Sequence, residues 1–332
     1  LSQAGKGFLY KMMRKKNITL NGKKCDGSER VEEGDEISLF LADETIEKFS
    51  APLPELAALG KEKDRNSGKA GKNGENGNRK KKQELSIVYE DKNVLIVNKP
   101  SGMLSQKAKE GDVSLNEHIL NYLIDSGHLP VSQLRTFRPS ICNRLDRNTS
   151  GIVAAGKTLQ GLQMLSGLFK ERTLHKYYLC IVKGVIKEEQ DVRGWLLKNE
   201  KTNQVRIFKN ETKDARPIHT KYRPLADNGQ ETLLEIELLT GRTHQIRAHL
   251  SYMGHPIFGD PKYGDAVLNK KLTSGYGLHM QLLHAWHLVF PELSGDFEGL
   301  SGKSIYAPAP KQFVSIAQKR GLGTWEHGIP EV

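Results

Sequence analysis

The sequence predicts an α+β fold built on a mixed, largely antiparallel sheet. The first observation behind this prediction is that helix and strand patterns follow one another without the regular β–α–β alternation that a parallel sheet requires. The second is composition: the chain has 332 residues, 37% hydrophobic and 27% charged, as in ordinary globular proteins. The sequence also contains no internal repeat. This length is sufficient for two domains and a substantial buried core.

Residues 1–42 are predicted to form a basic helix followed by a small sheet. The helix covers Phe8–Lys15, which is rich in Lys and Arg, and a short strand follows at Ile18–Leu20. Asn21-Gly22 is the dipeptide that a type I′ hairpin turn demands, because both positions need positive φ. After a second turn, the apolar positions alternate as in a strand, at Ile37, Leu39 and Leu41.

Residues 43–84 are predicted to be a flexible, basic linker. They are dense in Gly, Asn, Lys and Pro and almost lack apolar residues after Leu59. Such a segment cannot bury enough surface to offset the entropy of ordering, so disorder is expected over Lys61–Lys82. Residues 61–83 hold nine Lys or Arg and three Asp or Glu, a net charge of +6. The linker is either an arm that holds RNA or a solvated tether, and both interpretations stay open.

Residues 85–332 are predicted to form the large domain. A hairpin is expected from Ile87–Tyr89 and Val94–Val97. Ser114 and Glu117 form a capping box, from which a helix runs until Gly127 stops it. Further elements are a helix marked by Leu159, Leu162, Leu165 and Phe169, and strands at Tyr178–Val182 and Leu233–Leu239.

Charge and cysteine usage narrow the class of protein. The net charge is +11, which favours a polyanionic partner, RNA or DNA before a membrane, with simple solubility as the alternative. Three widely separated cysteines without a CxxC pair favour a reducing, cytoplasmic location without disulfides or a zinc site. No apolar run approaches a membrane span, and residues 1–16 lack the apolar segment of a secretory signal. Because the chain does not begin with Met, we expect a fragment or a processed chain.

Several familiar motifs are missing. The sequence has no GxGxxG after a strand, no GxSxG elbow and no HExxH. Dinucleotide binding and serine hydrolysis therefore lose most of their support.

The segment 143–155 places a charged side chain at the start of an apolar run. Asp146 stands between Arg144 and Arg147, a positive environment that favours the ionised carboxylate. Thr149-Ser150-Gly151 resembles a turn that delivers this Asp to the edge of a buried strand. The alternative is a surface turn closed by a salt bridge.

The segment 240–250 reads as a turn that leads into a helix. Ile246 and Leu250, four residues apart, would face the core, while Arg247 lies on another face, from which it could approach a buried carboxylate. The alternative is a helix whose polar face is only solvated.

An ordered set of segments resembles the RluA/RluC/RluD family of pseudouridine synthases. Residues 144–151 contain the family's RLDxxTSG signature. The other matches, in the family's order, are K-x-Y-x-x-x-V-x-G at 176–184, GRTHQIR at 241–247, GHPIxGD-xx-YG at 254–264 and LHA at 283–285. The resemblance spans about residues 87–310. One departure is Asn143, where the family often has His.

The resemblance implies a pseudouridine synthase catalytic domain that isomerises uridines in folded RNA without a cofactor, nucleotide or metal. Asp146 would attack the flipped nucleotide at C1′, and Arg247 would be the cation that keeps it ionised. Tyr178 would stack on or hydrogen-bond the target base and assist removal of the C5 proton. The residues implied to bind or position the substrate are Arg144, which would fill the gap left by the flipped base, Arg242, His244 and Gln245.

Residues 11–41 resemble, more weakly, the small RNA-binding module named for ribosomal protein S4, with its first part truncated. A chain of this organisation is expected to be a monomer that acts on large-subunit ribosomal RNA rather than transfer RNA. Two other interpretations remain: a metal-dependent hydrolase, and a non-catalytic RNA-binding or ribosome-assembly protein. The chain has 11 His, but no pair of them has zinc-site spacing beside carboxylates, and His284 and His287 would point to opposite faces of a strand.

Overall fold

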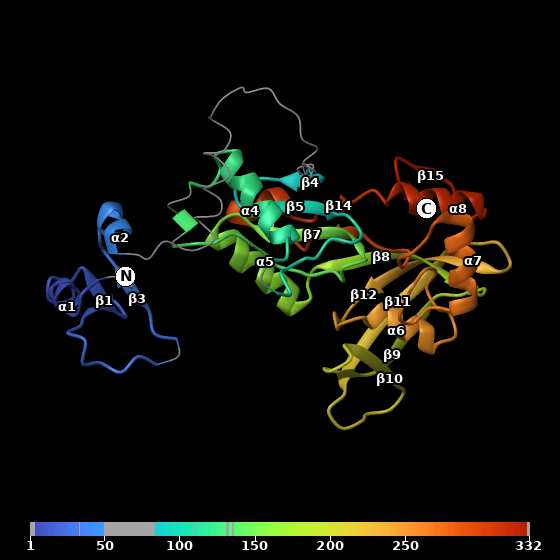
Figure 1. The fold of residues 1–332 in the computed structure, drawn as a ribbon, viewed down its shortest axis with the longest axis horizontal. Helices are drawn as coiled ribbons and strands as arrows, with labels where there is room; N and C mark the ends of the chain where they lie inside the picture. Colours follow the sequence, from blue (N-terminus) through green and yellow to red (C-terminus); the bar gives the residue numbers. More distant parts are fainter. Residues whose placement is uncertain are drawn as a thin grey trace, which may run out of the picture. The chain divides into compact units, whose positions relative to one another are not determined.

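The computed structural model describes residues 4–32, 34–49, 84–109, 111–130, 133–134 and 136–330. The chain divides into two compact units, residues 1–78 and 79–332 (Figure 1). Each unit is described by itself.

The first unit has a basic helix and a three-stranded antiparallel sheet, ordered β2-β1-β3. Its elements are α1 (Lys6–Arg14), β1 (Ile18–Leu20), β2 (Lys23–Lys24), β3 (Ile37–Leu39) and α2 (Asp43–Phe49). Leu20 pairs with Lys23 across the two-residue turn, and both turn residues have positive φ, 51° at Asn21 and 72° at Gly22. The hairpin predicted from Asn-Gly is therefore confirmed.

Helix α2 occupies the first seven residues of the segment that the sequence predicts to be a linker. That part of the prediction is wrong for a physical reason: the ring of Phe49 lies 4.4 Å from the ring of Phe8, so tertiary packing supplies the apolar contact that composition does not reveal. The disorder expected over Lys61–Lys82 falls outside the described residues.

The second unit is built on one twisted sheet. Among the described residues it has 11 strands, with the path β10-β9-β11-β12-β8-β13-β7-β5-β4, while β14 pairs with β13 and β6 with β7. All these neighbours run antiparallel except β13 and β7, which confirms the mixed, largely antiparallel prediction. The strands are β4 (Ile87–Glu90), β5 (Val94–Lys99), β6 (Ser140–Ile141), β7 (Ser150–Gly156), β8 (His175–Lys183), β9 (Gln190–Asn199), β10 (Gln204–Phe208), β11 (Arg216–Asp227), β12 (Glu231–Leu238), β13 (Leu283–Val289) and β14 (Ser304–Tyr306).

Helices cover both ends of this sheet, α4 and α5 near β5 and β7, and α6 and α7 beside β9–β12 (Figure 1). The capping box predicted at Ser114 and Glu117 is present at the start of α4, and Thr158 caps α5 by accepting the Gly161 N–H. The helices are α4 (Leu115–Asp125), α5 (Leu159–Glu171), α6 (Gln245–Tyr252), α7 (Ala266–Tyr276), the 3₁₀ turn η2 (Gly295–Leu300) and α8 (Lys311–Lys319), followed by the small hairpin β15 (Trp325–Glu326) and β16 (Ile329–Pro330).

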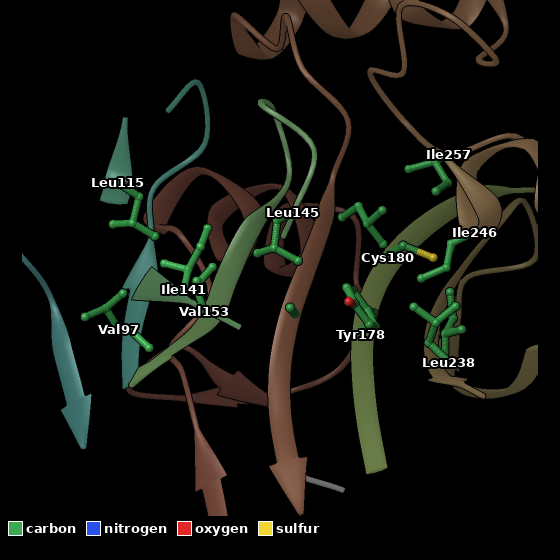
Figure 2. Packing of buried hydrophobic residues seen from close by; sticks show 14 of the residues in the cluster. Val97, Leu115, Ile141, Leu145, Val153, Tyr178, Cys180, Leu238, Ile246 and Ile257 are labelled. Atoms are coloured by element: carbon green, nitrogen blue, oxygen red, sulfur yellow. The ribbon is translucent and has the colours of Figure 1, made fainter. Parts of the chain in front are cut away.

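The largest buried apolar cluster crosses the middle of the sheet. Figure 2 shows it extending from Val97 and Leu115 through Leu145 on the loop before β7, then Tyr178 on β8, to Ile246 on α6. The two segments that the sequence singles out for chemistry are thus anchored in one core. Ile246 and Leu250 face this core, as their four-residue spacing predicts.

Gly151 explains the small residue in the Thr-Ser-Gly turn. It follows Ser150 in the parallel pairing of β7 with β13 and lies opposite Ala285, at φ 116°. A Cβ atom there would overlap the backbone of Ala285. Only glycine allows the two strands to approach this closely, and their contact fixes the loop that carries Asp146.

Candidate active site

Asp146 lies on a loop between β6 and β7 whose neighbouring residues are immobilised by hydrogen bonds. The Thr149 N–H donates to the Asp146 carbonyl at 3.0 Å, which closes the turn. Ser105 clamps the preceding residue, because its Oγ donates to the Leu145 carbonyl at 2.8 Å and accepts the Leu145 N–H at 3.1 Å. Beyond the turn, Ser150 Oγ and His284 Nδ1 are 2.9 Å apart in a fully buried contact. The Asp146 carboxylate is therefore presented from a rigid support, with its side chain 26% exposed.

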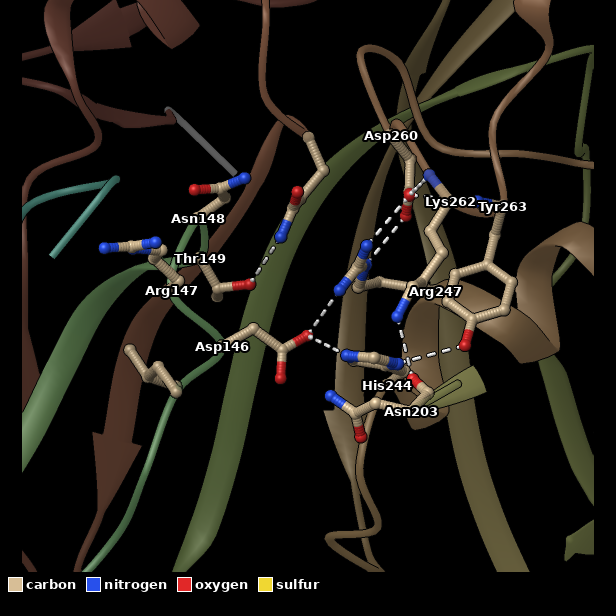
Figure 3. Close-up of polar contacts among 12 residues, drawn as sticks. Asp146, Arg147, Asn148, Thr149, Asn203, His244, Arg247, Asp260, Lys262 and Tyr263 are labelled. Atoms are coloured by element: carbon tan, nitrogen blue, oxygen red, sulfur yellow. Dashed lines mark hydrogen bonds and ion pairs between the residues drawn. The ribbon is translucent and has the colours of Figure 1, made fainter. Parts of the chain in front are cut away.

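Arg247 joins this carboxylate to a second, deeper one (Figure 3). Its Nη1 donates to Asp146 Oδ2 at 2.8 Å. Its Nε and Nη2 donate to Asp260 Oδ2 and Oδ1 at 2.8 and 2.9 Å, a bidentate pair. Arg247 is 7% exposed and Asp260 is not exposed at all. The sequence prediction that Arg247 approaches a buried carboxylate agrees with this geometry, and the alternative of a merely solvated helix face does not.

Asp260 anchors the guanidinium because its own charge is fully supported. Burial by itself would raise its pKa, but the hydrogen bonds and charge of Arg247, together with the N–H groups of Lys262 and Tyr263, hold the pKa below its ordinary value. Those two N–H groups donate to Asp260 Oδ1 at 2.8 and 3.0 Å. Arg247 likewise stays charged, since its two carboxylate partners outweigh burial and raise its pKa.

One carboxylate oxygen of Asp146 is available to react with a substrate. Oδ2 accepts from Arg247, whereas Oδ1 has no hydrogen-bond donor within the described part of the chain. A carboxylate held by one oxygen, with the other facing a cavity, has the geometry of an oriented nucleophile.

His244 forms the second side of this arrangement. It precedes α6 in a left-handed conformation, φ 54°, a backbone state that a non-glycine residue adopts only when its surroundings impose it. Its Nε2 lies 3.8 Å from Asp146 Oδ2, and its Nδ1 lies 3.0 Å from Tyr263 Oη. Burial lowers the pKa of His244, although the Asp146 charge opposes this, so the ring is neutral near pH 7.

The hydrogen bonds define which nitrogen of His244 carries the proton. The Val205 N–H can only donate, and it donates to Tyr263 Oη at 3.0 Å. Within the described residues, His244 Nδ1 is the only acceptor in reach of the Tyr263 hydroxyl, so we assign the hydroxyl as donor and Nδ1 as acceptor. The neutral ring then carries its hydrogen on Nε2, the atom that faces Asp146.

We expect Tyr263→Phe to lower both stability and turnover. The substitution leaves the Val205 N–H and His244 Nδ1 without their partner, a cost of about 1–3 kcal/mol. It also releases the tautomer of His244, which should reduce the catalytic rate severalfold. Thermal unfolding, the ¹⁵N NMR signals of His244 and single-turnover rates test this. Tyr252→Phe, on an exposed position of α6, is the control. An unchanged His244 tautomer would contradict the assignment.

These groups open into a cavity of about 480 Å³. Tyr178 lies in its wall, 8% exposed. Burial, reinforced by the Asp146 charge, raises the pKa of Tyr178, so the phenol remains protonated. The cations that line the cavity are Arg144, Lys170, Arg172, Lys176, Arg242 and Arg247. A cavity of this size with a cationic lining matches a nucleotide and its phosphates.

The predicted substrate-contact residues separate into two kinds. Arg144 and Arg242 are exposed at the rim, and Arg144 has one long hydrogen bond, 3.5 Å to Gln106. Gln245 instead is buried, and its amide is engaged on both atoms. Oε1 accepts from Thr240 and from the Arg242 N–H at 2.9 and 3.1 Å, and Nε2 donates to Thr220 at 3.0 Å. Gln245 therefore holds the turn before α6, which is a positioning role.

Asn143, the one departure from the family's motif, hydrogen-bonds the backbone of β7 through both atoms of its amide. Its Nδ2 donates to the Ile152 carbonyl at 3.1 Å, and its Oδ1 accepts the Ala154 N–H at 2.8 Å. The amide thus ties the Asp146 loop to β7.

Lys99 is a site residue that the sequence reading missed. It is fully buried, and its Nζ donates to the carbonyls of Pro100, Met103 and Arg147 at 3.0, 2.8 and 3.1 Å. Burial lowers its pKa to about 7, against the opposing charge of Asp146. The ammonium thereby fastens the loop after β5 to the Asp146 loop. A lysine two residues beyond the apolar run Val94–Val97, on the same strand, was the available signal.

Asp260 and Tyr263 were also missed as functional residues, although both lie in a recognised motif segment. Nothing in their local sequence reveals that they contact Arg247 and His244, because those contacts arise only when the loop after α6 folds back. Over the described residues, no group of three His, Cys, Asp or Glu is arranged to hold a metal ion. Among the helices that the structure describes, none is both long and apolar enough to span a membrane.

Solved structures with the same fold define the class. The human RNA pseudouridylate synthase domain containing 4 superimposes with a TM-score of 0.56 at 21% identity, covering 73% of this chain and 95% of that one. The human RNA pseudouridylate synthase domain containing 1 gives 0.50 at 22% identity, covering 72% and 96%. The fold is that of the pseudouridylate synthases.

Sequence comparison narrows the class to a family. The family model described as RNA pseudouridylate synthase matches residues 93–252. Ribosomal large subunit pseudouridine synthase C of Vibrio cholerae is 32% identical over 87% of this chain and 82% of its own length. The Escherichia coli protein of the same name is 30% identical over 86% and 80%. The chain belongs to the RluA/RluC/RluD family of RNA pseudouridine synthases, as its motif segments predict.

Proposed function

We propose that this enzyme converts uridine to pseudouridine in large-subunit ribosomal RNA, with Asp146 as its nucleophile. The observation that carries the proposal is the Asp146 carboxylate, oriented through Oδ2 by Arg247 while Oδ1 faces a cationic cavity. Neither the metal-hydrolase interpretation nor the non-catalytic interpretation explains this arrangement of the carboxylate.

The reaction is an isomerisation that balances without a co-reactant. Asp146 Oδ1 attacks C1′ of the flipped uridine, and the bond between C1′ and N1 breaks. The base turns, its C5 bonds to C1′, and the bond from Asp146 to C1′ breaks. The C5 proton then leaves and N1 holds a proton, so the product has the same composition as the substrate. No nucleotide, metal or redox cofactor is needed for these steps.

The surrounding residues have separate roles in this reaction. Arg247 orients Asp146 through the hydrogen bond to Oδ2 and places a positive charge beside it, and the neutral His244 directs its Nε2–H toward the same carboxylate. Tyr178, protonated and set in the cavity wall, stacks on or hydrogen-bonds the base, and as a neutral phenol it is a poor acceptor for the C5 proton. Arg144, exposed at the rim, fills the space that the flipped base leaves.

The choice of ribosomal RNA rests on the names of the relatives and on charge. The Vibrio cholerae and Escherichia coli relatives are named for the large ribosomal subunit. The chain has a net charge of +11, and in the first unit α1 carries Lys6, Lys11 and Arg14 on its short length. We propose that residues 1–42 act as an S4-like RNA-binding domain and that the enzyme works as a cytoplasmic monomer.

Pseudouridine mapping by carbodiimide labelling tests the function. Cells that lack the protein should lose discrete pseudouridines in large-subunit ribosomal RNA, and expression of the wild-type chain should restore them. Asp146→Asn should not restore them. A loss confined to transfer RNA would reject the proposed substrate, whereas unchanged RNA together with a growth defect rescued by Asp146→Asn would favour a non-catalytic assembly role.

A further inference from the structure

A second cavity, of about 520 Å³, adjoins the catalytic one. The two share four lining residues, which lie between the end of α5 and the start of β8 and at the end of β12: Arg172, Lys176, Leu238 and Leu239. A polymer that leaves the catalytic cavity on this side would pass directly into the second one. We call this second cavity the Trp195 groove.

The floor of the Trp195 groove is formed by neighbouring strands of the sheet. Trp195 on β9 pairs in register with Pro217 on β11, and Arg193 pairs with His219. Trp195 is only partly buried, and Gly194 beside it adds no side chain. An indole that is left accessible between strands is a platform on which a planar base can stack.

Four cations line the Trp195 groove without a carboxylate partner. Across the described residues, none of Arg172, Lys176, Arg193 or Lys209 makes an ion pair. Glu237, which also lines the groove, is hydrogen-bonded to His175 at 2.7 Å, and Asp191 is hydrogen-bonded to His219 at 2.5 Å.

Other lysines of the same unit are neutralised within the protein. Lys183 pairs with Asp265 at 2.6 Å, and Lys187 with Asp227 at 3.0 Å. In the Trp195 groove, by contrast, burial and the neighbouring Arg172 charge lower the pKa of Lys176, although the Glu237 charge opposes this. Like charges held together beside an aromatic ring form a surface that is complementary to a polyanion with planar bases.

We propose that the Trp195 groove binds single-stranded RNA that flanks the target uridine. One flanking base stacks on Trp195, and the adjoining phosphates contact Arg193, Lys209 and Arg172. This inference rests on the proposed function for its choice of RNA, since the strand enters the groove from the catalytic cavity. It adds a determinant of substrate selection outside the catalytic cavity: a target uridine must be followed, on one side, by nucleotides that are free of pairing.

The test compares two double variants that lose the same charge. Arg193→Gln/Lys209→Gln removes two exposed cations of the groove. Lys183→Gln/Lys187→Gln removes two cations that are already paired elsewhere, and serves as the control. The probe is an unmodified large-subunit ribosomal RNA transcript that spans a mapped target, used at full length and trimmed from each side.

The groove variant should bind the full-length transcript about tenfold more weakly, with unchanged turnover at saturating RNA. Two lost contacts to single-stranded phosphates should reduce the slope of log Kd against log salt by about 1.4. RNA trimmed on the flank that occupies the groove should bind the wild type and the variant equally. Trp195→Leu should repeat the loss of binding, by about tenfold for one stacked base, without changing the salt slope.

The proposal would be overturned if the control variant lost as much RNA affinity as the groove variant. It would also be overturned if the groove variant lost the same affinity for full-length and for trimmed RNA. Failure of the proposed function has a separate signature, because wild-type enzyme would then form no pseudouridine in any transcript. In that case, binding of a mixed-sequence single-stranded RNA of about 16 nucleotides still tests whether the groove binds RNA. If it does, the two double variants must differ in their Kd for this RNA.

Discussion

Asp146→Asn should reduce pseudouridine formation by about 10⁴-fold or more while the RNA affinity stays within about threefold of wild type. The amide has the size of the carboxylate but neither its charge nor its nucleophilicity. Arg247 keeps its bidentate contact to Asp260, and the amide oxygen of the new Asn can still accept from its Nη1, so the fold should persist. Single-turnover product formation and Kd, measured on the same ribosomal RNA transcript, check both parts of this expectation.

Asp296→Asn is the matched control for this substitution. Asp296 is exposed and pairs with Lys92 outside the site, so its variant should keep full activity. Activity of Asp146→Asn within about tenfold of wild type would reject the nucleophile assignment. Loss of RNA binding along with activity would instead assign Asp146 a structural role.

Arg247→Met should be the most destabilising change in the site. It leaves the carboxylate of Asp260 buried and unpaired, which costs about 3–5 kcal/mol. For a unit of this size that cost corresponds to a fall in Tm of about 10 °C. Turnover should fall as well, because Asp146 loses the cation that orients it. Thermal unfolding and single-turnover rates measure the two effects separately.

A second substitution separates stability from catalysis. Arg247→Met/Asp260→Leu replaces the buried ion pair by apolar side chains, an exchange that is often neutral for stability. The double variant should regain most of the lost Tm and none of the lost activity. Recovery of activity in the double variant would show that Arg247 acts only by neutralising Asp260, and would contradict its proposed role toward Asp146.

The pH dependence of stability gives an independent check on the same pair. In the wild type the pKa of Asp260 lies below its ordinary value, so its contribution is present above the ordinary pKa and is lost only in strong acid. In Arg247→Met, uncompensated burial should raise that pKa, and protonation of Asp260 would then relieve the cost. The stability difference between wild type and variant should therefore narrow as the pH falls from neutral into the mildly acidic range. A constant difference would argue against a buried charge as the cause.

The elements that the sequence predicts correctly are those with a local cause. Asn21-Gly22 specifies a hairpin because both residues tolerate positive φ, and Ser114 with Glu117 specifies a helix start because their side chains satisfy its first N–H groups. Helix α2 was missed because its stabilising contact, Phe49 on Phe8, joins residues that are distant in the sequence.

The same distinction applies to the site. Sequence alone determined the family, the Asp146 segment and the Arg247 helix, since these reside in contiguous motifs and in the apolar spacing of Ile246 and Leu250. The family resemblance implied that Arg247 lies beside Asp146, 101 residues away, but the sequence did not reveal that Arg247 also binds Asp260, because that contact forms only when the loop after α6 folds back.

Tertiary structure alone decided the remaining features. The tautomer of His244 depends on Val205 and Tyr263, which meet only where β10 lies beside α6. The Trp195 groove forms where β9 and β11 pair beside the catalytic cavity, and no motif marks it. Local propensities act over a few residues, whereas hydrogen-bond partners, burial and shifted pKa values are set by contacts that exist only after the strands have assembled.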